Sequence, residues 1–125
     1  MDEDKLNRLP PDVKKQFLKY ALKLSEKKTK TKVHDDFMTF VKHVWPEFIE
    51  GRHHKEIAEK FNQIARGEIK RLIINMPPRH TKSEFASFLL PSWMVGRKPN
   101  LKIIQTTHTT ELAIRFGRKA KTLMD

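Results

Sequence analysis

Hydrophobic positions repeat at helical spacing through the first half of the chain. In PDVKKQFLKYALKLS, residues 11–25, apolar side chains recur every three or four positions from Val13 to Leu24. Pro11 suits the first turn of a helix, where its missing N–H costs nothing. The same spacing predicts amphipathic helices at residues 11–25, 34–44 and 53–66.

The run EKKTKTK, residues 26–32, carries five charges and no apolar side chain. Such a run is typical of a linker or a frayed helix end. We therefore expect a helical N-terminal extension with its basic linker in residues 1–32, and a second domain in residues 33–125.

The pattern changes in the second half, where two short β-branched runs appear: RLIIN (71–75) and LKIIQTT (101–107). A helical segment follows each run, at 83–96 and at 110–124, and Pro91 must kink or shorten the first because it lacks a backbone donor. Strands that alternate with helices are typical of a parallel sheet with right-handed crossovers. The sequence therefore predicts an α/β fold.

Composition adds a strongly basic charge, because 26 Lys and Arg residues outnumber 15 Asp and Glu residues and give a formal net charge of +11. That balance favours a polyanionic partner, nucleic acid first and an anionic membrane surface second. The chain has no cysteine, which excludes disulfides and thiolate zinc sites. No apolar run approaches the roughly 20 residues of a membrane span, and the acidic start MDEDKLNRLP lacks the apolar core of a secretory signal. We expect a soluble protein of a reducing cytosol.

Candidate chemistry lies in MPPRHTKS, residues 76–83, which has the layout of a phosphate-binding loop between a strand and a helix. In G-x-x-x-x-G-K-[ST], the lysine reaches the β- and γ-phosphates and the hydroxyl binds Mg²⁺. Lys82 and Ser83 occupy those positions, but Met76 and Thr81 replace the glycines. A β-branched residue is strained where φ is positive. Spacing alone leaves open a nucleotide site and a basic turn with no ligand.

From about residue 36 to 124 the chain resembles the start of the ATPase domain of tailed-phage terminase large subunits, the DNA-packaging motors. The segment GRHHKEIAEKF, a Gly-Glu pair, the loop MPPRHTKS, a Pro-containing helix and ELAIRFGRK occur here in the family's order. The resemblance implies a deviant Walker A loop at the beginning of a P-loop NTPase parallel sheet, with ATP and Mg²⁺ as cofactors.

The resemblance also implies what the intact protein does. ATP hydrolysis would drive double-stranded DNA through a portal into a procapsid in the host cytoplasm. The implied partners are double-stranded phage DNA, a portal protein, a small terminase subunit and further copies of the large subunit in a ring, with no membrane.

Carried over residue by residue, the resemblance assigns Lys82 to the β/γ-phosphates, Ser83 to Mg²⁺ and Arg79 to the γ-phosphate. Arg79 and Lys82 are therefore the candidate catalytic residues. His54 lies in the segment expected to approach the adenine, although a histidine on an apolar helix face is more often a core residue. The candidate nucleotide-binding residues are Pro78, Arg79, His80, Thr81, Lys82, Ser83, Glu84 and His54.

In that family the Walker B aspartate, the catalytic glutamate and the nuclease domain would lie beyond Asp125. We therefore expect an N-terminal part of a terminase that does not hydrolyse ATP by itself. The alternative is a basic DNA-binding or adaptor module without NTPase activity. The last predicted helix carries a basic set, for which a solvated face is the default and DNA-backbone contact the second interpretation: Arg115, Arg118, Lys119 and Lys121.

Overall fold

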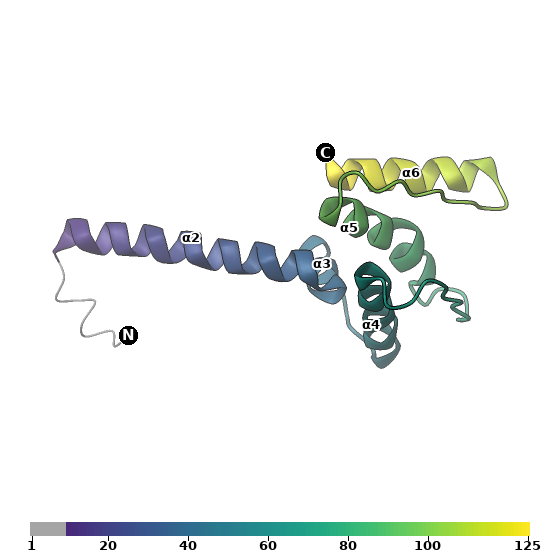
Figure 1. The fold of residues 1–125 in the computed structure, drawn as a ribbon, viewed down its shortest axis with the longest axis horizontal. Coiled ribbons are helices and arrows are strands. Elements are labelled where there is room, and N and C mark those ends of the chain that lie inside the picture. The colour runs from purple at the N-terminus through teal and green to yellow at the C-terminus, as the bar shows by residue number, and fades with distance from the viewer. Residues whose placement is uncertain (1–9) are drawn as a thin grey trace. The chain divides into compact units, whose positions relative to one another are not determined.

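The structure is a computed structural model, which describes residues 10–125 as a series of helices joined by irregular segments (Figure 1). The chain divides into two compact units between Lys32 and Val33. The helices are α2 (Pro11–Asp35), α3 (Phe37–Val44), α4 (Arg52–Arg66), the π-helix η1 (Glu84–Leu89), α5 (Leu90–Arg97) and α6 (Thr110–Met124).

The predicted α/β fold is wrong, because residues 10–125 contain no strand and the described fold is helical. The runs at 71–77 and 101–107 are irregular. Leu72 and Ile74 pack against the helical core, whereas Ile73 is 85% exposed and Ile104 is 91% exposed. A strand of a parallel sheet needs a paired neighbour and cover on both faces. Within the described chain these β-branched runs have neither: Leu72 and Ile74 of the first run pack against the helical core, and Gln105 of the second run donates to the Ser87 carbonyl.

In the first unit, α2 continues without a break through the run 26–32, where a linker or frayed end was expected. Lys and Glu are good helix formers. The hydroxyls of Ser25, Thr29 and Thr31 donate to backbone carbonyls three or four residues earlier, which keeps these polar side chains compatible with the helix. No residue of α2 is buried.

Phe37, at the start of α3, is the centre of the core of the second unit. Its ring is fully buried and makes T-shaped contacts with Phe61, Phe85 and Trp93, at centroid distances of 5.0, 5.5 and 5.4 Å. These rings belong to α4, η1 and α5, so one side chain joins all of these helices to α3. Each such aromatic pair contributes about 0.5–1.5 kcal/mol beyond the burial of its surface.

A polar network beside Phe37 fixes α3 against α4. The Asp36 carboxylate caps α3 by accepting from the Thr39 N–H at 2.7 Å, and it accepts from Asn62 Nδ2 at 2.8 Å. Asn62 Oδ1 in turn accepts from the Phe37 N–H at 2.9 Å. Burial raises the pKa of Asp36, but the hydrogen bonds from Thr39 and Asn62, together with Lys42, outweigh that effect and lower it.

Pro91 shapes the helix that follows residues 76–83. In a regular α-helix the residue-91 N–H would bond to the Ser87 carbonyl, and proline has no such donor. The chain responds with the π-helix η1, which ends where Leu90 N donates to Phe85 O. Gln105 Nε2 donates to the freed Ser87 carbonyl at 2.6 Å. The predicted kink or shortening at Pro91 thus takes the form of a π-helix, and Gln105 fastens the irregular segment to it.

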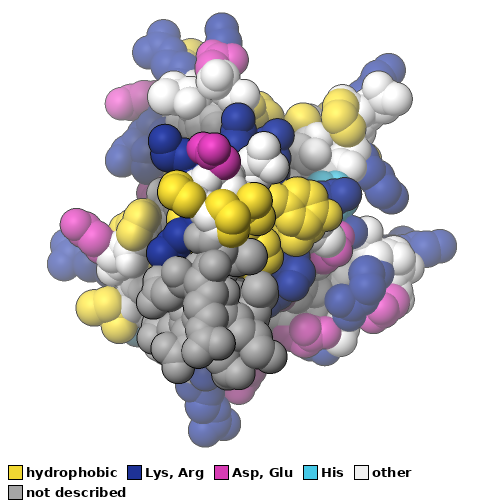
Figure 2. Space-filling model, turned by 90° about the vertical axis from the view of Figure 1, so that its left-hand side faces the viewer, with side chains coloured by type: hydrophobic (Ala, Val, Ile, Leu, Met, Phe, Trp, Pro, Cys, Tyr) yellow, Lys and Arg dark blue, Asp and Glu magenta, His cyan; other side chains and the backbone are white. Residues whose placement is uncertain are grey.

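Lysine and arginine side chains are exposed at many points of the surface. Figure 2 shows several groups of them, together with a group of hydrophobic side chains near the middle of the view. Within residues 10–125, no helix is both long and apolar enough to cross a membrane.

We predict that Asn62→Ala destabilises the protein by about 2 kcal/mol, because it leaves the buried Phe37 N–H without an acceptor and Asp36 without a donor. Urea denaturation measures the change. Lys60→Ala, at an exposed position of the same helix, is the matched control. If the two substitutions cost the same, the network does not hold α3 against α4.

Candidate functional site

Residues 76–83 form a turn that leads into η1. Arg79 and Thr81 have φ values of +64° and +60°, and no other non-glycine residue in the described part of the chain has a positive φ. This conformation costs a non-glycine residue of order 1–3 kcal/mol. Thr81 stands where the phosphate-loop pattern has its second glycine. The backbone therefore adopts there the left-handed conformation that a glycine would take without strain.

A helix begins directly after Thr81, because the Phe85 N–H donates to the Thr81 carbonyl at 2.9 Å. The first N–H groups of a helix have no acceptor within the helix, and the helix dipole adds partial positive charge there. A left-handed residue followed by helical residues also turns successive N–H groups toward one side. This end of the loop has the backbone geometry of an anion-binding site.

Side chains of the loop add positive charge to this backbone. Lys82 Nζ donates to the Met76 carbonyl at 3.3 Å, so its ammonium connects the last part of the loop with the first. His80 Nδ1 lies 2.9 Å from the Pro78 carbonyl. Pro78, Arg79 and His80 are exposed, whereas Lys82 is half-buried. Arg79 therefore stands at the open side of the turn, whereas Lys82 bridges it.

His54 supports the loop from α4. The Gly51 N–H donates to His54 Nδ1 at 2.8 Å, so in the neutral ring the proton is on Nε2. His54 Nε2 lies 2.7 Å from Thr81 Oγ1, and the Thr81 hydroxyl donates to the His80 carbonyl at 2.6 Å. Three hydrogen bonds thus run in one direction from Gly51 to the loop.

The His54 ring belongs to the core rather than to an open cleft. It is 7% exposed and packs against the rings of Phe48 and Phe85, with centroids 4.8 and 5.3 Å away. Burial is the main cause that lowers the pKa of His54, and the nearby His53 and His80 lower it further, while Glu50 opposes the shift. The structure therefore holds His54 as a neutral ring beneath the loop.

The remaining predicted residues differ in their surroundings. Ser83 is exposed in the first turn of the helix. The Glu84 carboxylate accepts from Lys119 Nζ of α6 at 2.9 and 3.0 Å, so it is engaged away from the loop. Residues 10–125 contain no group of three or more acidic or histidine side chains that could hold a metal. A Mg²⁺ ion at Ser83 would take its other ligands from phosphate and water, which suits this metal.

Sequence reasoning missed two partners of these residues, Gly51 and Lys119. The spacing of Gly51 and His54 is that of an N-cap and its third helical residue, and this spacing was the available signal for the first. The pairing of Lys119 with Glu84 joins residues 35 positions apart, and only the packing of α6 reveals it.

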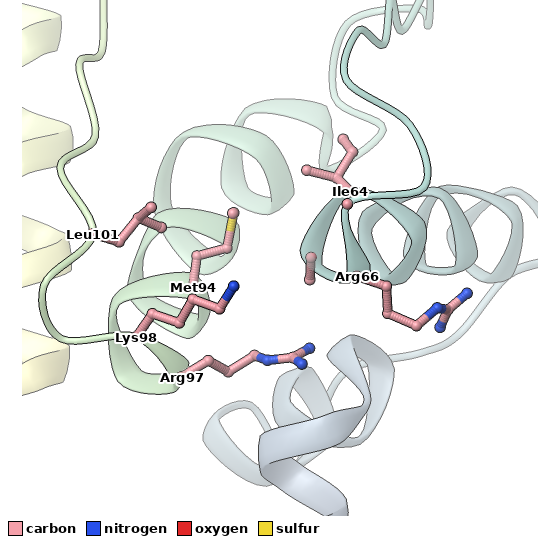
Figure 3. A pocket seen from close by; sticks show the side chains of 8 residues that line it. Ile64, Arg66, Met94, Arg97, Lys98 and Leu101 are labelled. Atoms are coloured by element: carbon pink, nitrogen blue, oxygen red, sulfur yellow. The ribbon is translucent and has the colours of Figure 1, made fainter.

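A separate cavity of about 230 Å³ lies between the ends of α4 and α5 (Figure 3). Arg97 extends over the Trp93 ring, 4.8 Å from its centroid, and its buried Nη1 has no partner within the described chain. Water in such a cavity would satisfy this donor. No residue of the turn 76–83 lines the cavity, so it is distinct from the loop.

Comparisons with known protein families, with curated proteins and with solved structures found no match to this chain.

The pH dependence of stability should carry a contribution from His54. Its pKa in the folded protein is lowered from the ordinary 6.5, so as the pH falls the unfolded chain takes up this proton first. The ionisation of His54 has no effect on stability at pH values well above 6.5, and stability is lost as the pH falls below 6.5. Between about pH 7 and 5, the melting temperature of the wild type should fall more steeply than that of His54→Gln.

The two proteins differ only at residue 54, so the difference between their melting curves isolates the contribution of this residue. Parallel curves would mean that the ring is not held neutral beneath the loop.

Proposed function

We propose that residues 76–83 bind the phosphates of Mg·ATP as the Walker A loop of a terminase large subunit, a DNA-packaging motor. The observation that supports this most strongly is the left-handed conformation of Thr81 directly before the helix that carries Lys82 and Ser83. The backbone satisfies the geometric demand of the phosphate-loop pattern although the glycine is absent. The order of motifs from residue 36 to 124 supports the choice of family.

The roles follow from the contacts of the loop. Backbone N–H groups at the helix start would hold the phosphate oxygens, and Lys82 Nζ would exchange the Met76 carbonyl for the β- and γ-phosphates. Ser83 would contribute its hydroxyl to Mg²⁺. Arg79, exposed at the tip of the turn, would face the γ-phosphate. Bound Mg²⁺ would neutralise charge on the β- and γ-phosphates.

The positive charge of the chain favours binding of both proposed anionic ligands, nucleotide and DNA. A net charge of +11 raises the local concentration of nucleotide and of DNA by long-range attraction. In the proposed motor, hydrolysis of ATP to ADP and phosphate drives translocation of double-stranded DNA into a procapsid.

Lys82→Ala should weaken Mg·ATP binding by about ten- to a hundredfold. The substitution removes a charged hydrogen bond, worth about 1.5–3 kcal/mol, at a helix N-terminus that already favours anions. Isothermal titration calorimetry on the full chain measures the affinity.

Lys121→Ala is the matched control, since it removes the same charge from an exposed position of α6. His80→Ala tests the loop itself, because this exposed ring bonds only to a carbonyl of its own turn in the described structure. Equal losses in all three variants would indicate a diffuse basic patch and refute the phosphate loop.

A second candidate function, DNA binding without nucleotide, is favoured by the exposed cations of α6. Arg115, Arg118 and Lys121 follow one another at three-residue spacing, and the first two line an open hollow of about 720 Å³. Cations spaced along a helix suit contacts with successive phosphates of a duplex.

If α6 binds the DNA backbone, replacing Arg115, Arg118 and Lys121 together by alanine should make the negative slope of log K against log salt shallower by about 2–3, since each phosphate contact contributes about −0.9. Fluorescence anisotropy with a labelled duplex at several salt concentrations measures this slope. Lys82→Ala should change it little. DNA affinity that the triple substitution leaves intact would remove α6 from the interface.

A further inference from the structure

The phosphate-loop pattern has a glycine at the position of Thr81, and the chain adopts the glycine-like conformation there with a β-branched residue. Val, Ile and Thr are outliers at positive φ, because the branched Cβ crowds the backbone. Such a conformation persists only where surrounding contacts hold it. A contact with Thr81 must therefore stabilise the left-handed conformation that a glycine would adopt without strain.

In the described structure, His54 is the only residue whose side chain forms a hydrogen bond with Thr81. Its bond to the Thr81 hydroxyl spans 27 residues of sequence, at 2.7 Å. The ring itself is held on its other nitrogen by the Gly51 N–H and on its faces by aromatic neighbours. A buried ring fixed in this way presents its Nε2–H at a defined point, which is what a positioning contact requires.

We propose that His54 is a positioning residue for the phosphate loop: its hydrogen bond to the Thr81 hydroxyl holds the left-handed backbone that phosphate binding requires. In this chain a histidine–threonine pair performs the task of the missing glycine. The inference rests on the proposed function, since it concerns the same loop, and it assigns to His54 a structural contact with the loop instead of a contact with the base.

The pairing makes the two residues interdependent. With threonine at residue 81, loss of the His54 bond lets the loop leave its competent conformation, and the apparent affinity falls by the fraction of competent molecules. With glycine at residue 81, the left-handed conformation carries no strain and needs no support. The effect of residue 54 on phosphate binding should therefore depend on the residue at 81.

Two substitutions separate the two contacts of the ring. An asparagine amide reaches about as far as His54 Nδ1, so His54→Asn keeps an acceptor for the Gly51 N–H and loses Thr81. A glutamine amide reaches as far as Nε2, so His54→Gln keeps a donor toward the Thr81 hydroxyl. The two substitutions introduce the same amide group and differ only in the length of the side chain that carries it.

The experiment measures Mg·ATP affinity by calorimetry, and thermal stability alongside it, for the full chain and for His54→Asn and His54→Gln, each also combined with Thr81→Gly. We expect His54→Asn to weaken binding about tenfold when residue 81 is threonine and by less than about twofold in the Thr81→Gly background. His54→Gln should stay within about threefold of the wild type. Melting temperatures should fall for His54→Asn in both backgrounds, because the core contact is lost in each.

Equal losses of affinity in both backgrounds would overturn the inference, since His54 would then act only through general stability. Affinity that does not respond to His54→Asn at all would overturn it as well. These results are distinct from a failure of the proposed function, in which Lys82→Ala leaves binding unchanged. Lys82-dependent binding that ignores residue 54 would refute the positioning role alone.

Discussion

The contact of Phe37 with three aromatic rings is the interaction on which the loop depends. One of these rings, Phe85, contacts both Phe37 and His54. His54 then bonds to Thr81. A continuous path of packed rings and one hydrogen bond thus runs from the centre of the core to the strained turn. Because packed cores transmit displacements rather than absorbing them, the position of the loop is set by the helices beneath it.

This arrangement explains why strain collects at one place. Two left-handed non-glycine residues within a single turn cost of order 1–3 kcal/mol each, and a surface turn with no task would be expected to relax. The turn is instead held at both ends, by Lys82 on the Met76 carbonyl and by His54 on Thr81. Backbone strain clusters at functional sites, and here it lies directly before the start of a helix, where unpaired backbone N–H groups favour anions.

Local signals predicted part of this structure. Helical spacing identified α3, α4 and α6, and Gly67, which directly follows α4, has the left-handed φ of +79° that is typical of a glycine ending a helix. The prediction of two strands was wrong because a β-branched run such as LIIN indicates only an extended segment. Whether that segment pairs into a sheet depends on residues far away in the sequence. The contact of His54 with Thr81 could not be predicted for the same reason, since 27 residues separate the ring from the hydroxyl.

The described segment 71–77 forms no backbone hydrogen bonds of a sheet, and the contact of His54 with Thr81 is therefore more important for the position of the loop. Where a loop follows a paired strand, the backbone hydrogen bonds of the sheet fix the position of its first residue closely. Here the entry to the loop is positioned by the packing of Leu72 and Ile74, and its exit by the buried Phe85. Side-chain packing restrains direction less tightly than a ladder does. A bond from a fixed ring to the hydroxyl of the critical residue supplies the restraint that such an entry lacks.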